Sequence, residues 1–149
     1  MKKATKAQKL AEVDSKVYEF DVIAIDEGQF FTDIVEHCQK WSDQGKIVIV
    51  AALDATFERK PFGSICQLVA LAENVKKLTA VCLNCSGEAL FTHKHCNKTG
   101  EINDIGGLDK YIPVCRSCFI ELNTEVKLTN SNSTGSNSSG CNKSFENSP

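Results

Sequence analysis

Hydrophobic positions in the first half of the chain change between two periodicities. Residues 17–26 begin with alternating apolar and polar positions and become continuously apolar at 22–25, which predicts a strand buried on both faces. From Phe31 to Gly45 the apolar residues recur at helical spacing, which predicts a helix that ends at the glycine. Residues 46–54 are rich in β-branched side chains and predict a second strand.

Further elements extend this order on both sides. A short, mostly polar helix is predicted over residues 1–16, an amphipathic helix over 65–75 and a third strand over 78–82. Strand, helix, strand, helix, strand is the order typical of parallel strands joined by right-handed crossovers. The predicted fold class is therefore α/β.

The character of the chain changes after this third strand. Loops, glycines and cysteine pairs follow, and the last stretch consists mainly of Asn, Ser and Thr, which bury too little apolar surface to order themselves. We expect three parts: a partial α/β core over 1–81, a zinc-binding subdomain over 82–122, and a disordered tail over 123–149.

Composition narrows the class of protein. The 149 residues are 42% hydrophobic and 24% charged, enough for one compact core. A formal net charge of −2 offers no basic field for nucleic acid, and no apolar run approaches the roughly 20 residues that span a bilayer. The first residues lack the apolar segment of a secretory signal. We expect a soluble cytoplasmic protein without nucleic-acid or membrane partners.

Eight cysteines need a role other than disulfides in a reducing compartment. Two C-x-x-C pairs predict a tetrahedral Zn2+ site, although the segment between them, residues 86–114, is longer than the about 15–20 residues usual for such a site. A redox function and coincidence are the alternatives. Four thiolates leave no position for a catalytic water, so the predicted zinc is structural. Its ligands would be Cys82, Cys85, Cys115 and Cys118.

Three more potential ligands, His93, His95 and Cys96, lie between the pairs. They could replace a ligand or bind a second metal. The simpler interpretation, ordinary polar loop residues, is favoured.

Two adjacent acids, Asp26 and Glu27, end the first predicted strand, and Asp54 ends the second. Ligands of parallel sheets bind at the carboxyl ends of strands. An apolar strand that ends in Asp-Glu resembles the Walker B pattern, in which the Asp serves Mg2+ and the Glu accepts a proton. Many strands end in acids only because the chain returns to solvent. The motif that accompanies Walker B therefore has to decide between a functional site and an ordinary strand end.

That partner is the phosphate-binding loop, G-x-x-x-x-G-K-[ST], between a strand and a helix. The only G-x-x-x-x-G here, Gly135 to Gly140, lies in the predicted tail and is followed by Cys141. We interpret it as a compositional accident.

Several motifs in order make the chain recognisable. From about Val22 to Cys118 it resembles the thymidine kinases of the cytosolic, tetrameric, zinc-containing class (type II), in AIDEGQFF, VIVAALDATFERKPFG, LTAVCLNC, IGGLDKY and VCRSC. The resemblance implies a P-loop-type parallel sheet, incomplete at the N-terminus, followed by a zinc-ribbon-like subdomain with a lasso loop. It also implies a homotetramer that phosphorylates deoxythymidine at the 5'-hydroxyl with ATP and Mg2+, for DNA precursor salvage.

The resemblance assigns roles to the acidic turn. Glu27 matches the catalytic base, and Asp26 the acid of the nucleotide and Mg2+ site, with Gly28 and Gln29 beside it. Residues that match the nucleoside pocket are Phe30, Leu53, Phe57 and Phe62, with Phe57 against the thymine. Without the resemblance, core packing would be the better interpretation of any one Phe.

A lasso loop between the cysteine pairs closes over the base in this family, and the zinc would anchor both of its ends. Adjacent glycines at 106 and 107 suit such a loop because they permit close backbone approach. Asp104 departs from the pattern, at a position where an apolar residue is expected. The matching residues are Ile102, Asn103, Asp104, Ile105, Gly106 and Tyr111.

The family's phosphate-binding loop precedes the Asp-Glu strand, so we expect a truncated sequence with little kinase activity and with apolar sheet surface exposed. Two alternatives stay open. One is a non-catalytic paralogue that binds nucleoside or joins kinase oligomers, and the other is a zinc-ribbon module for nucleic acid.

Overall fold

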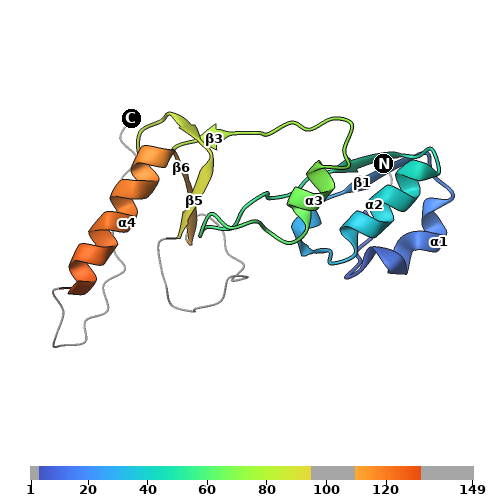
Figure 1. The fold of residues 1–149 in the computed structure, drawn as a ribbon, viewed down its shortest axis with the longest axis horizontal. Coiled ribbons are helices and arrows are strands. Elements are labelled where there is room, and N and C mark those ends of the chain that lie inside the picture. The colour runs from blue at the N-terminus through green and yellow to red at the C-terminus, as the bar shows by residue number, and fades with distance from the viewer. Residues whose placement is uncertain (1–3, 95–109, 132–149) are drawn as a thin grey trace. The chain divides into compact units, whose positions relative to one another are not determined.

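The computed structural model describes residues 4–94 and 110–131. The chain divides into two compact units, Met1–Lys76 and Lys77–Pro149, which are described separately (Figure 1). No helix among the described residues is long and apolar enough to cross a membrane.

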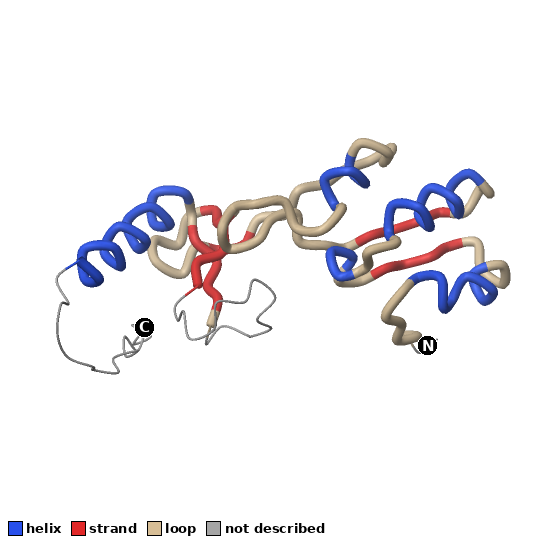
Figure 2. The backbone as a smooth tube through the Cα atoms, turned by 60° about the horizontal axis from the view of Figure 1, so that its bottom comes forward, coloured by secondary structure: helices blue, strands red, loops and turns tan. Residues whose placement is uncertain are grey.

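A parallel strand pair organises the first unit (Figure 2). Strand β1 (Val22–Ile25) pairs with β2 (Ile47–Val50), and helix α2 (Ile34–Asp43) connects them. The register sets Ile23 beside Val48 and Ile25 beside Val50. The prediction of an α/β arrangement with this helix is confirmed, although both strands are shorter than the pattern indicates.

The burial of the two strands follows a period of two rather than covering both faces. Ile23, Ile25, Val48 and Val50 face the core, whereas Val22, Ile47 and Ile49 are 50%, 60% and 56% exposed. The prediction that β1 is buried on both faces is wrong, because the described helices of this unit pack on one side of the strand pair only. The expectation of exposed apolar sheet surface is confirmed.

The N-terminal helix is shorter than predicted. Residues 4–9 are not helical; a 3-10 turn, η1 (Leu10–Val13), leads into α1 (Asp14–Val17). Val17 therefore ends a helix instead of beginning a strand. The carboxylate of Asp33 accepts the backbone N–H groups of Leu10 at 3.2 Å and Ala11 at 3.0 Å, so a long-range contact sets where the helical segment begins.

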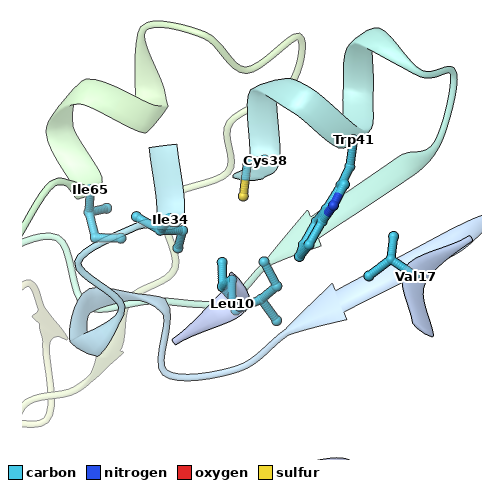
Figure 3. Packing of buried hydrophobic residues seen from close by; sticks show 7 residues of the cluster. Leu10, Val17, Ile34, Cys38, Trp41 and Ile65 are labelled. Atoms are coloured by element: carbon cyan, nitrogen blue, oxygen red, sulfur yellow. The ribbon is translucent and has the colours of Figure 1, made fainter. Parts of the chain in front are cut away.

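Side chains from separate elements meet in the core of this unit (Figure 3). Trp41 and Ile34 of α2 are fully buried. The indole Nε1 of Trp41 donates to Asp14 Oδ1 at 2.8 Å, and Lys40 Nζ donates to Asp14 Oδ2 at 2.7 Å. One carboxylate thus satisfies the buried indole and fixes α1 against α2.

Gly45 ends α2 as predicted. It takes φ +81°, a conformation that favours glycine. Its N–H donates to Ser42 O at 2.8 Å, and the N–H of Lys46 donates to Trp41 O at 3.1 Å, which is the Schellman pattern.

Helix α3 (Ile65–Val69) ends earlier than the predicted Val75. Val69, Leu71 and Val75 are 45%, 48% and 59% exposed. Tertiary packing supplies most of the stability of short helices, and these residues have too little of it to extend the helix.

The described part of the second unit contains two short antiparallel pairs. Strand β3 (Ala80–Val81) pairs with β4 (Glu88–Ala89), and β5 (Phe91–Lys94) pairs with β6 (Tyr111–Val114). The third predicted strand therefore belongs to a hairpin and not to the parallel sheet, because the N–H of Cys82 bonds to Gly87 O at 2.7 Å and turns the chain back. Helix α4 (Arg116–Ser131) follows. It includes residues 123–131, which the sequence assigned to the disordered tail.

Truncating the side chain of Trp41 should lower the stability of the first unit. We expect Trp41→Ala to lower the free energy of unfolding by about 3–5 kcal/mol. The substitution leaves a large cavity in the core and removes the hydrogen bond from the indole to Asp14. Urea denaturation followed by far-ultraviolet circular dichroism measures this. Tyr18→Ala, at a side chain 59% exposed, is the control, and equal losses in the two variants would contradict the packing described.

Stability should also depend on Asp14 in acid. The hydrogen bond from Lys40, then that from Trp41, lowers the pKa of Asp14 below its usual 3.8. A depressed pKa contributes stability above the unfolded value, and this contribution is lost as the pH falls through the folded value. Asp14→Asn keeps an acceptor for Trp41 but should show a weaker loss of unfolding free energy below about pH 4. Lys40→Met should reproduce that weaker dependence, and an unchanged slope in both would refute the assignment.

Candidate functional site

The carboxyl ends of β1 and β2 lie side by side and position the acidic turn. Ala51, just after β2, donates its N–H to Ile25 O at 2.9 Å and accepts the N–H of Gly28 at its own carbonyl at 3.0 Å. Asp26 and Glu27 therefore emerge at one edge of the parallel pair, as their sequence positions predict, and both are exposed.

Glu27 adopts a left-handed backbone conformation, with φ 54° and ψ 40°. This conformation costs a non-glycine residue on the order of 1 kcal/mol, and such residues are more frequent at functional sites than elsewhere. The N–H of Glu27 donates to Asp26 Oδ1 at 3.0 Å, and the carbonyl of Glu27 accepts from Phe30 N at 3.1 Å. The backbone from which the two adjacent carboxylates project is thus fixed.

Gly28 is buried where no side chain fits. A Cβ at this position would lie 2.7 Å from Val50 Cγ1 and 2.9 Å from Ile34 Cδ1. The backbone of the acidic turn therefore packs directly on β2 and α2. The family resemblance implies that Gly28 lies at the nucleotide site, which stays a prediction; the structure shows that Gly28 permits this close approach.

Gln29 is the buried side chain of the turn, only 5% exposed. Its Nε2 donates to Glu27 Oε2 at 2.6 Å, and its Oε1 accepts the N–H of Leu53 at 3.0 Å. One amide therefore joins the acidic turn after β1 to the chain that leaves β2.

Aromatic side chains gather beside this edge. Phe30 and Phe62 form an edge-to-face pair with ring centroids 5.6 Å apart. The N–H of Phe62 bonds to Asp54 O at 3.0 Å, which closes the loop that contains the half-buried Phe57. Phe30 and Leu53 stay 47% and 53% exposed, which is unusual for core residues. An exposed aromatic edge beside two carboxylates suits a planar, polar ligand.

Four sulfurs come together in the second unit. The Sγ atoms of Cys82, Cys85, Cys115 and Cys118 all lie within 4.8 Å of one another, and those of Cys85 and Cys115 are 3.7 Å apart. Four thiolates at about 2.3 Å from one Zn2+ have sulfur separations of about 3.8 Å. The four cysteines are therefore close enough together to hold a zinc ion, as their spacing predicts.

Hydrogen bonds to the sulfurs support this cluster. The backbone N–H of Cys115 donates to Cys82 Sγ at 3.2 Å, and Asn84 Nδ2 donates to Cys118 Sγ at 3.2 Å. Ser86 takes φ 60° and donates its N–H to Cys82 O at 2.8 Å, which completes the tight turn around the first pair. The sequence did not lead us to predict a role for Asn84. The feature that could have indicated one is an amide side chain between two ligand cysteines.

The thiols differ in acidity before a metal binds. Burial disfavours the thiolate of Cys82, but the N–H groups of Cys115, Asn84 and Cys85 outweigh it and lower its pKa to about 6. Asn84 favours the thiolate of Cys118, but the neighbouring cysteines and burial outweigh this amide and raise its pKa to about 12.

His93 does not join the cysteine cluster. It is buried on β5 with its ring edge-on to Phe119, at 6.3 Å between ring centroids, and its Nδ1 lies 3.4 Å from Asn123 Nδ2. His95 and Cys96 lie outside the described residues. So do five of the predicted lasso residues, 102–106, whereas Tyr111 begins β6, with the ammonium of Lys94 at 5.7 Å from its ring centroid.

Comparison with known proteins gives consistent matches. A family model described as thymidine kinase matches residues 1–119. The chain is 54% identical over 118 residues to the thymidine kinase of vaccinia virus (strain Western Reserve), which covers 79% of this chain and 66% of the viral protein. It is 53% identical to that of variola virus and 52% identical to that of monkeypox virus, with the same coverage. The chain thus spans just under two thirds of the length of these curated relatives.

Zinc binding is directly measurable on this chain. We expect the reduced protein to bind about one equivalent of Zn2+, and Cys118→Ser to bind it much more weakly, because one ligand of the four is lost. Metal content after gel filtration, measured by plasma mass spectrometry, gives the result. Cys66→Ser changes an exposed cysteine outside the cluster and should retain the metal. Loss in both variants, or in neither, would contradict the four-sulfur site.

Proposed function

The chain belongs to the thymidine kinase family, and from this premise we propose that it phosphorylates deoxythymidine at the 5'-hydroxyl with ATP, together with a phosphate-binding loop supplied from outside these 149 residues. The observation that carries the proposal is the acidic turn: Asp26 and Glu27 project from one edge of a parallel strand pair, beside the aromatic pair of the exposed Phe30 and the half-buried Phe62. The reaction belongs to DNA precursor salvage.

Each acid has its own task in this proposal. Glu27 accepts the proton of the 5'-hydroxyl as that oxygen attacks the γ-phosphate, and Asp26 serves the Mg2+ that accompanies ATP. Hard carboxylate oxygens are the ligands that Mg2+ prefers, and an exposed carboxylate can reach the substrate proton. The fixed backbone of the turn supports this division, because proton transfer needs a base held within hydrogen-bond reach.

The nucleoside would lie along the aromatic edge. Phe30, Phe62 and Leu53 offer exposed or half-exposed apolar surface, and Phe57 lies in the adjoining loop. Aromatic faces suit a planar base, whereas the sugar and phosphate need polar groups. The predicted roles of residues 102–106 and of Tyr111 in reading the base stay predictions.

The cysteine cluster completes the proposal with a structural Zn2+. Four sulfur ligands would close the coordination shell, so the metal would hold the second unit together and leave the phosphoryl transfer to the acidic turn. The family also implies a homotetramer in the cytoplasm, and both stay predictions.

A second candidate is a non-catalytic relative that binds nucleoside or joins kinase oligomers. It is favoured by one observation: G-x-x-x-x-G-K-[ST] does not occur in the 149 residues. Phosphoryl transfer depends on positioning and charge neutralisation of the phosphates, which an isolated carboxylate does not supply.

The test is a thymidine phosphorylation assay on this chain and on a form extended upstream by a phosphate-binding loop. We expect turnover by the extended form, and we expect Glu27→Gln to lower its kcat by at least about 100-fold with little change in KM for thymidine. Cys66→Ser should retain full activity, because Cys66 lies outside both sites.

Other outcomes are equally clear. Full activity of Glu27→Gln would remove the assigned base. Thymidine binding by calorimetry without turnover in either form would favour the non-catalytic relative, and turnover by the 149-residue chain alone would show that the loop is dispensable.

A further inference from the structure

The side chain of Gln29 is held at both ends although it lies in an exposed turn. Its Nε2 is 2.6 Å from Glu27 Oε2, and its Oε1 is 3.0 Å from the N–H of Leu53, which lies 24 residues away. With 5% of its surface exposed, this amide has little access to solvent or to a ligand.

The orientation of the amide follows from the chemistry of its partners. The backbone N–H of Leu53 can only donate, so it must face the amide oxygen of Gln29. A carboxylate oxygen of Glu27 accepts, so it must face the nitrogen. Both constraints select the same orientation, and the bond to the charged oxygen is the stronger kind.

The backbone of Gln29 is fixed as firmly as its side chain. Gly63 takes φ +52°, and a Cβ there would lie 2.7 Å from Gln29 O, so the loop after Phe62 packs directly on this carbonyl. On the other side Gly28 is enclosed by Val50 and Ile34. Because its backbone is held on both sides, the Gln29 amide can fix the position of the flexible Glu27 side chain.

We propose that Gln29 is a positioning residue that orients the Glu27 carboxylate by tying it to the main chain at Leu53. This inference rests on the function proposed above, in which Glu27 is the base. An exposed Glu side chain samples many rotamers, and the bond from Gln29 selects one of them. The Glu27 carboxylate and the main chain at Leu53, beside the proposed nucleoside site, are then held in a fixed relative position.

The geometry separates this role from the nucleotide and Mg2+ role that the sequence suggests for Gln29. A ligand of Mg2+ or phosphate has to present a polar atom outward. Both polar atoms of Gln29 already bond within the chain, one to a carboxylate and one to the backbone after β2.

One substitution separates the two contacts of Gln29. Gln29→Glu keeps the size and the acceptor for Leu53 N–H, but it sets a second carboxylate against Glu27. Gln39→Glu, at an exposed position of α2, is the matched control for the added charge.

The first measurement needs no activity. In 15N-labelled 149-residue protein, we expect one Nε2 proton of Gln29 to resonate downfield of the side-chain amides of Gln39 and Gln67, because it donates to a carboxylate. Glu27→Ala removes the acceptor and should return this proton to the ordinary position. The same resonance position in both proteins would overturn the inference.

The second measurement is kinetic, on the extended form. We expect Gln29→Glu to lower kcat by about 10- to 100-fold through misplacement of the base, with KM for thymidine and ATP little changed. A raised KM for ATP with unchanged kcat would make Gln29 a nucleotide ligand instead. An effect equal to that of Gln39→Glu would also refute the role.

The two proposals can fail separately. If no form phosphorylates thymidine, the proposed function is wrong, while the amide resonance still decides whether Gln29 holds Glu27. If the extended form is active and the resonance does not respond to Glu27→Ala, the function stands and the positioning role falls. The double variant Glu27→Gln with Gln29→Glu restores a donor and an acceptor across the same contact and should recover the thermal stability that Gln29→Glu loses, but not the activity.

Discussion

The hydrogen bonds that Ala51 makes across the ends of β1 and β2 are the constraint on which the candidate site depends. Through Ile25 O and Gly28 N they hold the chain after β1 against the chain after β2. Because the strands are parallel, both chains leave at the same edge, and residues far apart in sequence meet there. This closure places the acidic turn beside the chain after β2, where the Gln29 amide bonds to Leu53, and the Phe62–Asp54 hydrogen bond brings the aromatic pair to the same edge.

The second unit depends less on apolar packing for its stability than the first unit does. Among its described residues the core is small, with Ile112, Val114 and Phe119 as the main apolar members, and the strands there are two to four residues long. Cores of this size rarely suffice alone, and a metal held by four thiolates contributes folding free energy directly. The sulfurs receive hydrogen bonds from the Cys115 amide and from Asn84, and such bonds would help to orient them toward a metal held there.

Local patterns in the sequence predicted what depends on neighbours along the chain. The spacing of Trp41 and its companions, with Gly45 at the end, gives α2. The sulfur cluster joins cysteine pairs far apart in sequence, and it was predictable because four thiolates suit one metal ion. Long-range contacts without such a motif escaped prediction for a physical reason. Hydrophobic periodicity does not say that β3 turns back onto β4, nor that the Gln29 amide reaches Leu53, since both depend on which segments the folded chain brings together.

The position of the acids is also independent of how the outer face of the strand pair is covered. Parallel sheets are normally buried on both faces, yet Ile47 and Ile49 are exposed on this face in the part of the chain that the structure describes. The acidic turn is held from the opposite side: Gly28 lies on Val50, and the Gln29 amide bonds to the chain after β2. The backbone of the acidic turn and the Gln29 amide are therefore held by the inner layer, independently of the exposed outer face.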